Sequence, residues 1–163
     1  MSEFKIDGVE YKITPLVGEN AYSLLSEMIA IAGEGAQFLP QILRGAMLDE
    51  EGDDEETAGV GAFYADIASF AACSAMIKES GYDTFAGFRR KIIETAMKKR
   101  PSGAYEQVKL DTDFLGNLVG AEKLFDHCIE AHFGPFSKGS EASGPVALAL
   151  ILIRNVFQVK KQS

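Results

Sequence analysis

The sequence has little of what several large functional classes require. Its two cysteines, Cys73 and Cys128, match neither a CxxC motif nor a disulfide framework, so we expect two free thiols in apolar helical segments. The longest apolar run, residues 146–153, is far shorter than the roughly 20 residues of a membrane span. Basic residues are outnumbered, and the formal net charge of −8 argues against a general nucleic-acid binder, because phosphate backbones are bound by basic side chains.

Motifs for catalysis, cofactors and metals are also missing. No serine lies in a Gly-x-Ser-x-Gly elbow, and the Gly-x-Gly patterns at 33–35 and 59–61 do not follow a predicted strand. His127 and His132 are five residues apart, about 140° around a helix, so they do not form the i, i+4 pair that ligates zinc. The acidic run 49–56 lacks the spacing of a calcium loop. We therefore expect no enzymatic activity, no cofactor and no metal site.

The length and composition indicate one globular domain. A chain of 163 residues with 47% hydrophobic and 25% charged residues supports one ordinary core. Residues 1–5 lack the basic and then apolar pattern of a secretory signal, so we expect a cytoplasmic protein.

The beginning of the chain predicts a β-hairpin. Apolar and charged residues alternate from Phe4 to Ile13 with the two-residue period of a half-buried strand. Asp7-Gly8 in the middle favours a type I′ turn. An isolated hairpin is marginally stable, so its apolar face must pack on the helices that follow.

Helical periodicity dominates after the hairpin, and the predicted fold class is mainly α. We expect helices at about 19–31, ended by Gly33 and Gly35, and at about 38–48. After the acidic loop 49–56, a helix from 57 to 80 carries a nearly unbroken apolar stripe, and Gly81 is its left-handed cap. The stripe comprises Val60, Phe63, Tyr64, Ile67, Phe70, Ala71, Ser74 and Ile77.

Two more helices complete this part of the chain. The first is capped by Asp83 or Thr84, buries Phe85, Phe88, Ile92 and Met97, and is stopped by 101–103. The second is capped within 111–113 and ends at Gly134-Pro135, and its Gly116 and Gly120 are expected to permit a close backbone approach.

The C-terminal part differs in composition. Residues 1–136 are predicted to form the core domain, and 137–145 a linker of small residues. The segment 146–163 begins with residues that are apolar almost all round, so it is expected to fill a groove in its own core or to dock on another chain. A basic segment, 89–100, and the acidic run 49–56 are read as solvated surfaces.

These segments resemble the tail assembly chaperones of long-tailed bacteriophages. The resemblance covers residues 4–136 in outline and is carried by the hairpin Phe4–Ile13, by 114–118 and 124–125, and by 131–136. In the family pattern the late helix closes on an Asn-Phe pair followed by further Phe, whereas this chain has His132 before Phe133 and then Phe136.

The resemblance implies a non-enzymatic function in the host cytoplasm. Such proteins bind the long tape measure protein, keep it soluble while the tail tube polymerises around it, and are absent from the finished virion. The tail tube protein is a second candidate partner, a homo-oligomer is left open, and the family often makes a longer frameshifted product. Partner binding is expected at apolar positions of the late helix and the tail that we expect to be exposed: Phe133, Phe136, Leu148, Ile151 and Phe157.

Two other interpretations stay open. A structural baseplate or tail-completion subunit that remains in the virion would use its apolar tail as a permanent docking arm. A small helical enzyme would need a pKa-shifted His127 or His132 in a pocket.

Overall fold

A computed structural model of the chain describes residues 2–44, 60–134 and 148–153. Within these residues the fold is mainly α with a small antiparallel sheet, as predicted. Helical turns at 39–44 and 148–153 accompany the following elements: β1 (Ser2–Ile6), β2 (Val9–Ile13), α1 (Glu19–Gly35), the 3₁₀ helix η1 (Ala36–Phe38), α3 (Val60–Ser80), α4 (Tyr82–Ile93), β3 (Ala96–Lys99), β4 (Tyr105–Gln107), α5 (Leu110–Asp113) and α6 (Leu118–Phe133).

The predicted N-terminal hairpin is confirmed. β1 pairs antiparallel with β2, and the two loop residues, Asp7 and Gly8, have φ of 49° and 82°. Positive φ at both positions is what a type I′ turn requires. The alternate residues Ile6, Tyr11 and Ile13 are buried in the core. The two-residue period of the sequence therefore places the hairpin on the helices.

Two further strands extend this hairpin into a sheet with the order β1-β2-β3-β4. β3 pairs antiparallel with β2, with Ala96 opposite Ile13, and β4 pairs with β3. The prediction of a helix that includes Met97 is wrong, because α4 ends at Ile93 and Met97 lies in β3. Pairing with the free edge of β2 satisfies the backbone of this segment, and such tertiary pairing overrides a local helical pattern.

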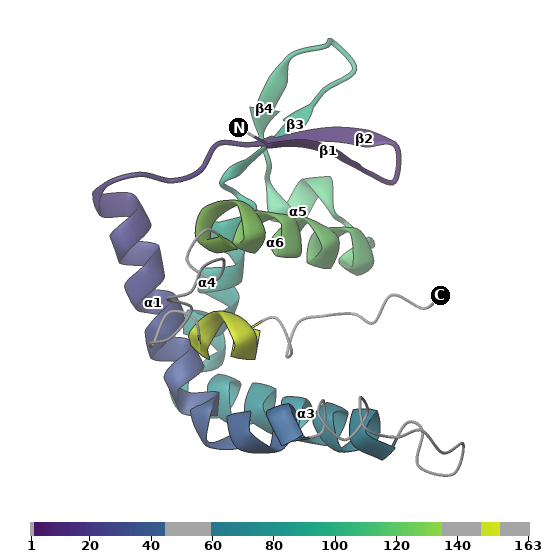
Figure 1. Cartoon of the computed structure of the whole chain (residues 1–163). Helices are drawn as coiled ribbons and strands as arrows, with labels where there is room; N and C mark the ends of the chain where they lie inside the picture. Colours follow the sequence, from purple (N-terminus) through teal and green to yellow (C-terminus); the bar gives the residue numbers. More distant parts are fainter. Residues whose placement is uncertain (1, 45–59, 135–147, 154–163) are drawn as a thin grey trace.

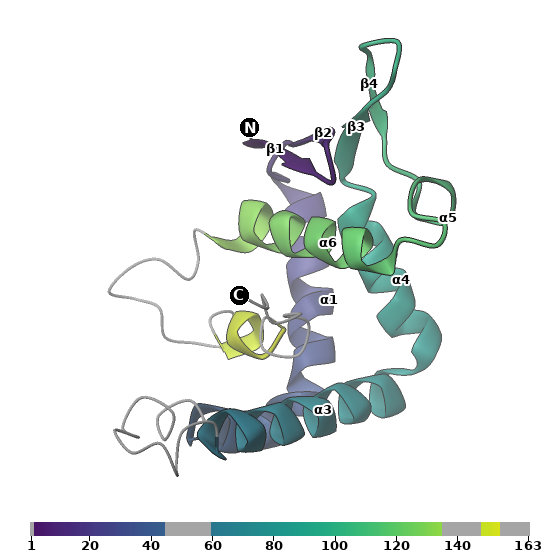
Figure 2. The same ribbon diagram turned by 90° about the vertical axis from the view of Figure 1, so that its right-hand side faces the viewer.

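The helices form an open frame (Figures 1 and 2). α6 lies beside the sheet at one end of the molecule, α3 lies at the other end, and α1 and α4 run between them. Residues 148–153 lie within this frame, between α6 and α3 in both views. Four of these residues, Ala149, Leu150, Leu152 and Ile153, are buried in the same core as the rest.

The predicted end of the first helix is confirmed at Gly35 but not at Gly33. α1 continues through Gly33 and ends at Gly35, and η1 and the helical residues 39–44 follow it directly. Gly35 is needed for space, since a Cβ there would lie 2.6 Å from Leu152 Cδ2 and 3.3 Å from the Ala72 carbonyl oxygen. Gly35 is therefore a position of close packing as well as the last residue of α1.

Caps at two helix starts also differ from the predictions. Gly81, with φ of 82°, separates α3 from α4, so Asp83 and Thr84 lie inside the first turn of α4 and do not cap it. The late helix is divided at Gly116 into α5 and α6.

Asn117 caps α6 by accepting a hydrogen bond from the Gly120 N–H at 2.9 Å. A Cβ on Gly120 would meet the Asn117 side chain, so this glycine accommodates a cap and not a neighbouring backbone.

Part of the predicted domain organisation lies outside the described residues. This applies to the acidic run 49–56 and to the linker 137–145, so the linker stays a prediction.

Candidate partner-binding surfaces

The two faces of α3 carry very different side chains: one face is buried and the other is exposed. The small residues Ala68 and Ala72, together with Met76, are buried against the core. On the opposite face Phe63 is 63% exposed and Phe70 is 75% exposed. Residues three or four apart share one face of a helix, so these two phenylalanines form a stripe with the exposed Ile67, and Tyr64 flanks it. We call these four residues the α3 aromatic face.

The packing of α3 explains why its large side chains face outward. Alanines at the contact let α3 approach α1 closely, and Gly35 of α1 leaves room for Met76 and the Ala72 backbone. The Phe63 and Tyr64 rings also contact each other edge to face, with centroids 6.3 Å apart. Contiguous exposed apolar side chains of this size mark an interaction site, because their exposure to water is unfavourable.

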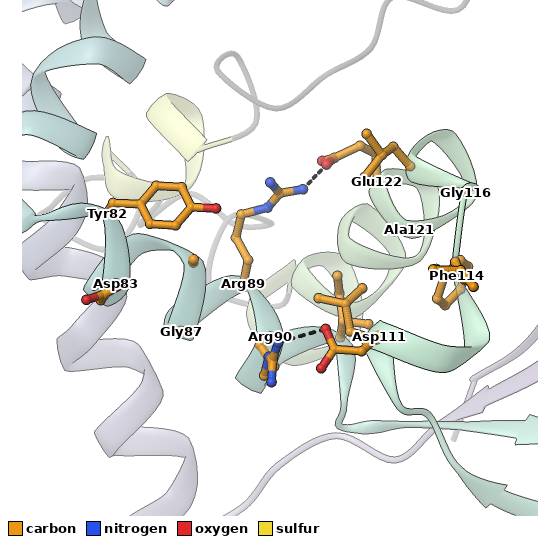
Figure 3. A pocket seen from close by; sticks show the side chains of 15 residues that line it. Tyr82, Asp83, Gly87, Arg89, Arg90, Asp111, Phe114, Gly116, Ala121 and Glu122 are labelled. Carbon is orange, nitrogen blue, oxygen red and sulfur yellow. Dashed lines mark hydrogen bonds and ion pairs between the residues drawn. The ribbon is translucent and has the colours of Figure 1, made fainter.

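A second apolar surface borders a groove between α4 and the α5–α6 segment (Figure 3). The groove has a volume of about 880 Å³. Its rim includes the exposed side chains of Tyr82, Leu115 and Leu118. Ion pairs from α4 to the α5–α6 segment cross it: Arg89 with Glu122, and Arg90 with Asp111 at 2.8 Å. These pairs hold the walls of the groove together.

His132 is buried and joins three segments. Its Nδ1 accepts a hydrogen bond from the Leu16 N–H at 3.2 Å, and its Nε2 lies 2.7 Å from Thr95 Oγ1. Thr95 donates its hydroxyl proton to the Ile92 carbonyl, so Nε2–H of a neutral imidazole donates to Thr95. Burial lowers the pKa of His132 to about 4. Both ring nitrogens form hydrogen bonds within the fold, so the role of His132 is structural.

His127 and Cys128 are neighbours of different character. The exposed His127 ring stacks on Phe4 of the hairpin, with centroids 4.1 Å apart. Cys128 is a free, buried thiol whose pKa burial raises to about 12, so it is inert as a nucleophile.

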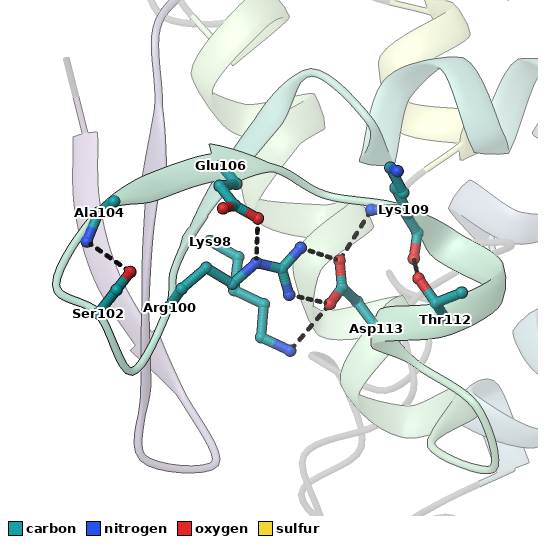
Figure 4. A network of polar contacts seen from close by, with 8 residues as sticks. All are labelled: Lys98, Arg100, Ser102, Ala104, Glu106, Lys109, Thr112 and Asp113. Atoms are coloured by element: carbon teal, nitrogen blue, oxygen red, sulfur yellow. Dashed lines mark hydrogen bonds and ion pairs between the residues drawn. The ribbon is translucent and has the colours of Figure 1, made fainter.

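The most developed polar network is centred on Asp113 (Figure 4). Its buried carboxylate accepts hydrogen bonds from the Arg100 guanidinium, from the Lys109 N–H at 2.9 Å and from Lys98 Nζ at 3.2 Å. Burial raises the pKa of Asp113, but these hydrogen bonds outweigh it and lower the pKa to about 2. Arg100 also pairs with Glu106 at 3.0 Å. The network fastens the β3–β4 hairpin to α5.

Several residues of the basic segment 89–100 pair with acidic side chains at the surface. Lys91 binds Glu27 at 2.8 Å, and Lys99 binds Glu10 at 2.6 Å. Such pairs contribute little to stability, and they leave this segment without an uncompensated positive patch.

The expected partner-binding residues occupy different environments. Phe133 is 2% exposed and packs in the core, so the expectation that it is exposed is wrong. Leu148 is exposed and Ile151 is partly buried, on the helical turn 148–153. Phe136 and Phe157 lie outside the described residues. The structure thus leaves Leu148 as the accessible member of this set among the residues it describes.

Sequence reasoning did not predict that the α3 aromatic face is exposed. The sequence shows the apolar stripe of this helix, but an apolar stripe on a helix ordinarily faces the core. One signal was available, since the opposite side of the same helix carries alanines that can pack closely. In α3 the side with the alanines is buried, and the side with the large aromatic residues is exposed.

Other kinds of site find no support in the part of the chain that the structure describes. Residues 2–44, 60–134 and 148–153 contain no group of three or more His, Cys, Asp or Glu side chains placed to hold a metal ion. Within the same residues no helix is long and apolar enough to cross a membrane.

Contiguous exposed apolar side chains on a helical domain are typical of surfaces that bind other proteins. The family model for the phage tail assembly chaperone protein, TAC, matches residues 7–144, which is most of the chain. The chain therefore belongs to the phage tail assembly chaperone family. No curated protein and no solved structure matches it. A chaperone family points to a non-enzymatic role in phage tail assembly.

Proposed function

We propose that this protein binds the phage tape measure protein through the α3 aromatic face and keeps it soluble in the host cytoplasm during tail assembly. The observation that carries the proposal is a row of large apolar side chains on the outside of a protein of this family. A tape measure protein is expected to be long and helical, with apolar stripes that aggregate when uncovered. An exposed helix face with i, i+4 and i+7 anchors is suited to such a stripe.

The charge of the protein supports the same role. A net charge of −8 keeps a complex soluble and makes identical complexes repel one another. The acidic chain thus limits self-association while its apolar face is engaged or free.

The test is a double substitution on the α3 aromatic face, Phe63→Asp with Phe70→Asp. Both side chains are exposed, so the fold is expected to be retained, with unchanged circular dichroism. Binding to co-expressed tape measure protein is expected to weaken by about tenfold or more, because interface aromatics contribute most of the binding energy. Isothermal titration or co-purification yield measures the change.

Tyr22→Asp is the matched control. Tyr22 is an aromatic side chain on α1 that is 72% exposed, comparable with Phe70, but it lies outside the α3 aromatic face. Its replacement is expected to leave binding unchanged. Equal binding by the wild type and by the double variant would contradict the assignment of this face.

Purified virions separate the proposal from the structural-subunit alternative. A chaperone is expected to be absent from finished particles by mass spectrometry. Its presence there at a fixed copy number would favour a baseplate or tail-completion subunit.

A further inference from the structure

A third apolar surface, on α1, is already occupied by part of the chain itself. Residues 148–153 form a helical turn beside α1 and the helical residues 39–44 (Figure 1). Leu152 is fully buried there, and its Cδ2 stands 2.6 Å from the place that a Cβ on Gly35 would take. We call this surface the α1 groove.

The α1 groove is larger than the turn that occupies it. A cavity of about 450 Å³ stays open beside the turn. Among the described residues its walls carry no charged side chain, and they include Ile29, Ala32, Leu39, Leu43, Leu148 and Leu152. The turn itself is Leu-Ala-Leu-Ile-Leu-Ile, so the groove accepts an uncharged apolar helix, and open apolar volume lies beside it.

We propose that the α1 groove is a second client site, which takes an apolar helical segment of the tape measure protein in place of residues 148–153. This inference rests on the proposed function above. The turn shows that the groove binds apolar helical residues. The client is expected to offer a helix of the same apolar character that is longer than the turn. An exchange of one apolar helix for another leaves the core covered in both states, so it requires no net exposure of apolar surface.

The competition between turn and client is unequal in two ways. A segment of the same chain acts at an effective concentration in the millimolar range, which favours the turn. A longer client helix buries additional apolar area in the open cavity, which favours the client. Weakening the turn is therefore expected to strengthen client binding, whereas an ordinary core residue would have the opposite effect.

Hydrogen exchange of the wild-type full-length protein tests the exchange directly. The backbone amides of residues 149–153 are expected to lose protection when the tape measure protein binds, while those of residues 28–35 in α1 keep or gain it. Retained protection of 149–153 in a complex that forms would overturn the proposal and leave the α3 aromatic face unaffected.

Two substitutions provide the matched comparison. Leu152→Ala removes the main anchor of the turn, and we expect the affinity for the tape measure protein to rise by about threefold to tenfold. Leu43→Asp places a charge at a partly exposed position of the groove wall, and the affinity is expected to fall by about tenfold. Weaker binding by a folded Leu152→Ala variant would assign the turn to the core and overturn the proposal.

The remaining outcomes are distinguishable. No complex with the wild type at all would mean that the proposed function fails. A wild-type dimer, detected by light scattering and abolished by Leu43→Asp, would assign the groove to a second copy of this chain and overturn the client assignment.

Discussion

Two ionisable side chains in the interior, His132 and Asp113, connect segments that are far apart in the sequence. His132 of α6 is hydrogen-bonded to Leu16 after the hairpin and to Thr95 before β3. Asp113 of α5 accepts hydrogen bonds from Lys98 and Arg100 of the β3–β4 hairpin. Neither side chain lines the large groove between α4 and α6. Their altered pKa values therefore affect the stability of the fold.

Asp113→Asn is expected to lower the free energy of unfolding at pH 7 by about 2 kcal/mol, the equivalent of the pKa difference between about 2 in the folded state and 3.8 in the unfolded state. The unfolded state takes up the proton first, so the wild type loses this contribution as the pH falls from about 4 to about 2. Urea unfolding at several pH values measures it. Asp111→Asn, at an exposed ion pair, is the control and is expected to change stability by less than about 1 kcal/mol.

His132→Asn is expected to remove a pH dependence of stability. In the wild type the unfolded state binds a proton near pH 6.5, whereas the buried imidazole does so only near pH 4. Stability is therefore complete above pH 6.5 and decreases by about 3 kcal/mol as the pH falls to about 4. Asparagine can still accept from the Leu16 N–H but does not titrate. An equally steep loss in the variant over this range would contradict the assignment.

At the level of elements, α1 and α3 show what a local pattern can predict. Periodicity located both helices, and the Asp7-Gly8 turn located the hairpin with its register. The pattern did not reveal that Gly35 is a packing position, because its reason is Leu152, more than 100 residues later. It also did not predict β3, because the partner strand β2 lies roughly 80 residues earlier in the sequence, beyond the reach of a local window.

The candidate site was less predictable than the fold. The sequence analysis predicts an exposed Phe133, but this side chain lies on the buried face of α6 and packs in the core. Which of two apolar faces of α3 is outward depends on the side chains of α1 that it meets. The alanines in the α3 sequence indicate a close contact, but only the packing against α1 shows that this side is the buried one.

Gly33 and Gly35 of α1 offer a controlled comparison. A Cβ at Gly33 meets nothing within 4 Å, so Gly33→Ala is expected to stabilise the protein by up to about 1 kcal/mol through helix propensity. At Gly35 the same methyl group clashes with Leu152 and Met76, so Gly35→Ala is expected to be about 1–3 kcal/mol less stable than Gly33→Ala. Thermal unfolding distinguishes them, and equal stabilisation would mean that 148–153 do not pack against α1.

At the level of the whole molecule, an apolar face is combined with a net charge of −8. The charge opposes association of identical molecules, and the face favours it. Repulsion between exposed charges is screened by salt, whereas apolar contact is not. Their balance therefore depends on ionic strength.

Self-association of the client-free protein is expected to increase with salt. Static light scattering at about 20 mM and about 500 mM salt is expected to show a higher apparent mass at the higher concentration. The added salt shortens the Debye length and thereby screens the repulsion between the surface charges. The Phe63→Asp, Phe70→Asp variant is expected to show a much smaller rise. An identical salt response of both proteins would exclude the α3 aromatic face as the contact.

The pairing of β2 with β3 has a consequence for the order of events at the ribosome. Ile13 lies opposite Ala96, so roughly 80 residues must be synthesised after β2 before its partner strand exists, on the order of ten seconds at usual elongation rates. A nascent hairpin alone is marginal during this interval. The sheet can close only after β3 and β4 have emerged, and the His132 hydrogen bonds only after α6 has followed, so a chain truncated before β3 keeps an unprotected apolar N-terminal hairpin.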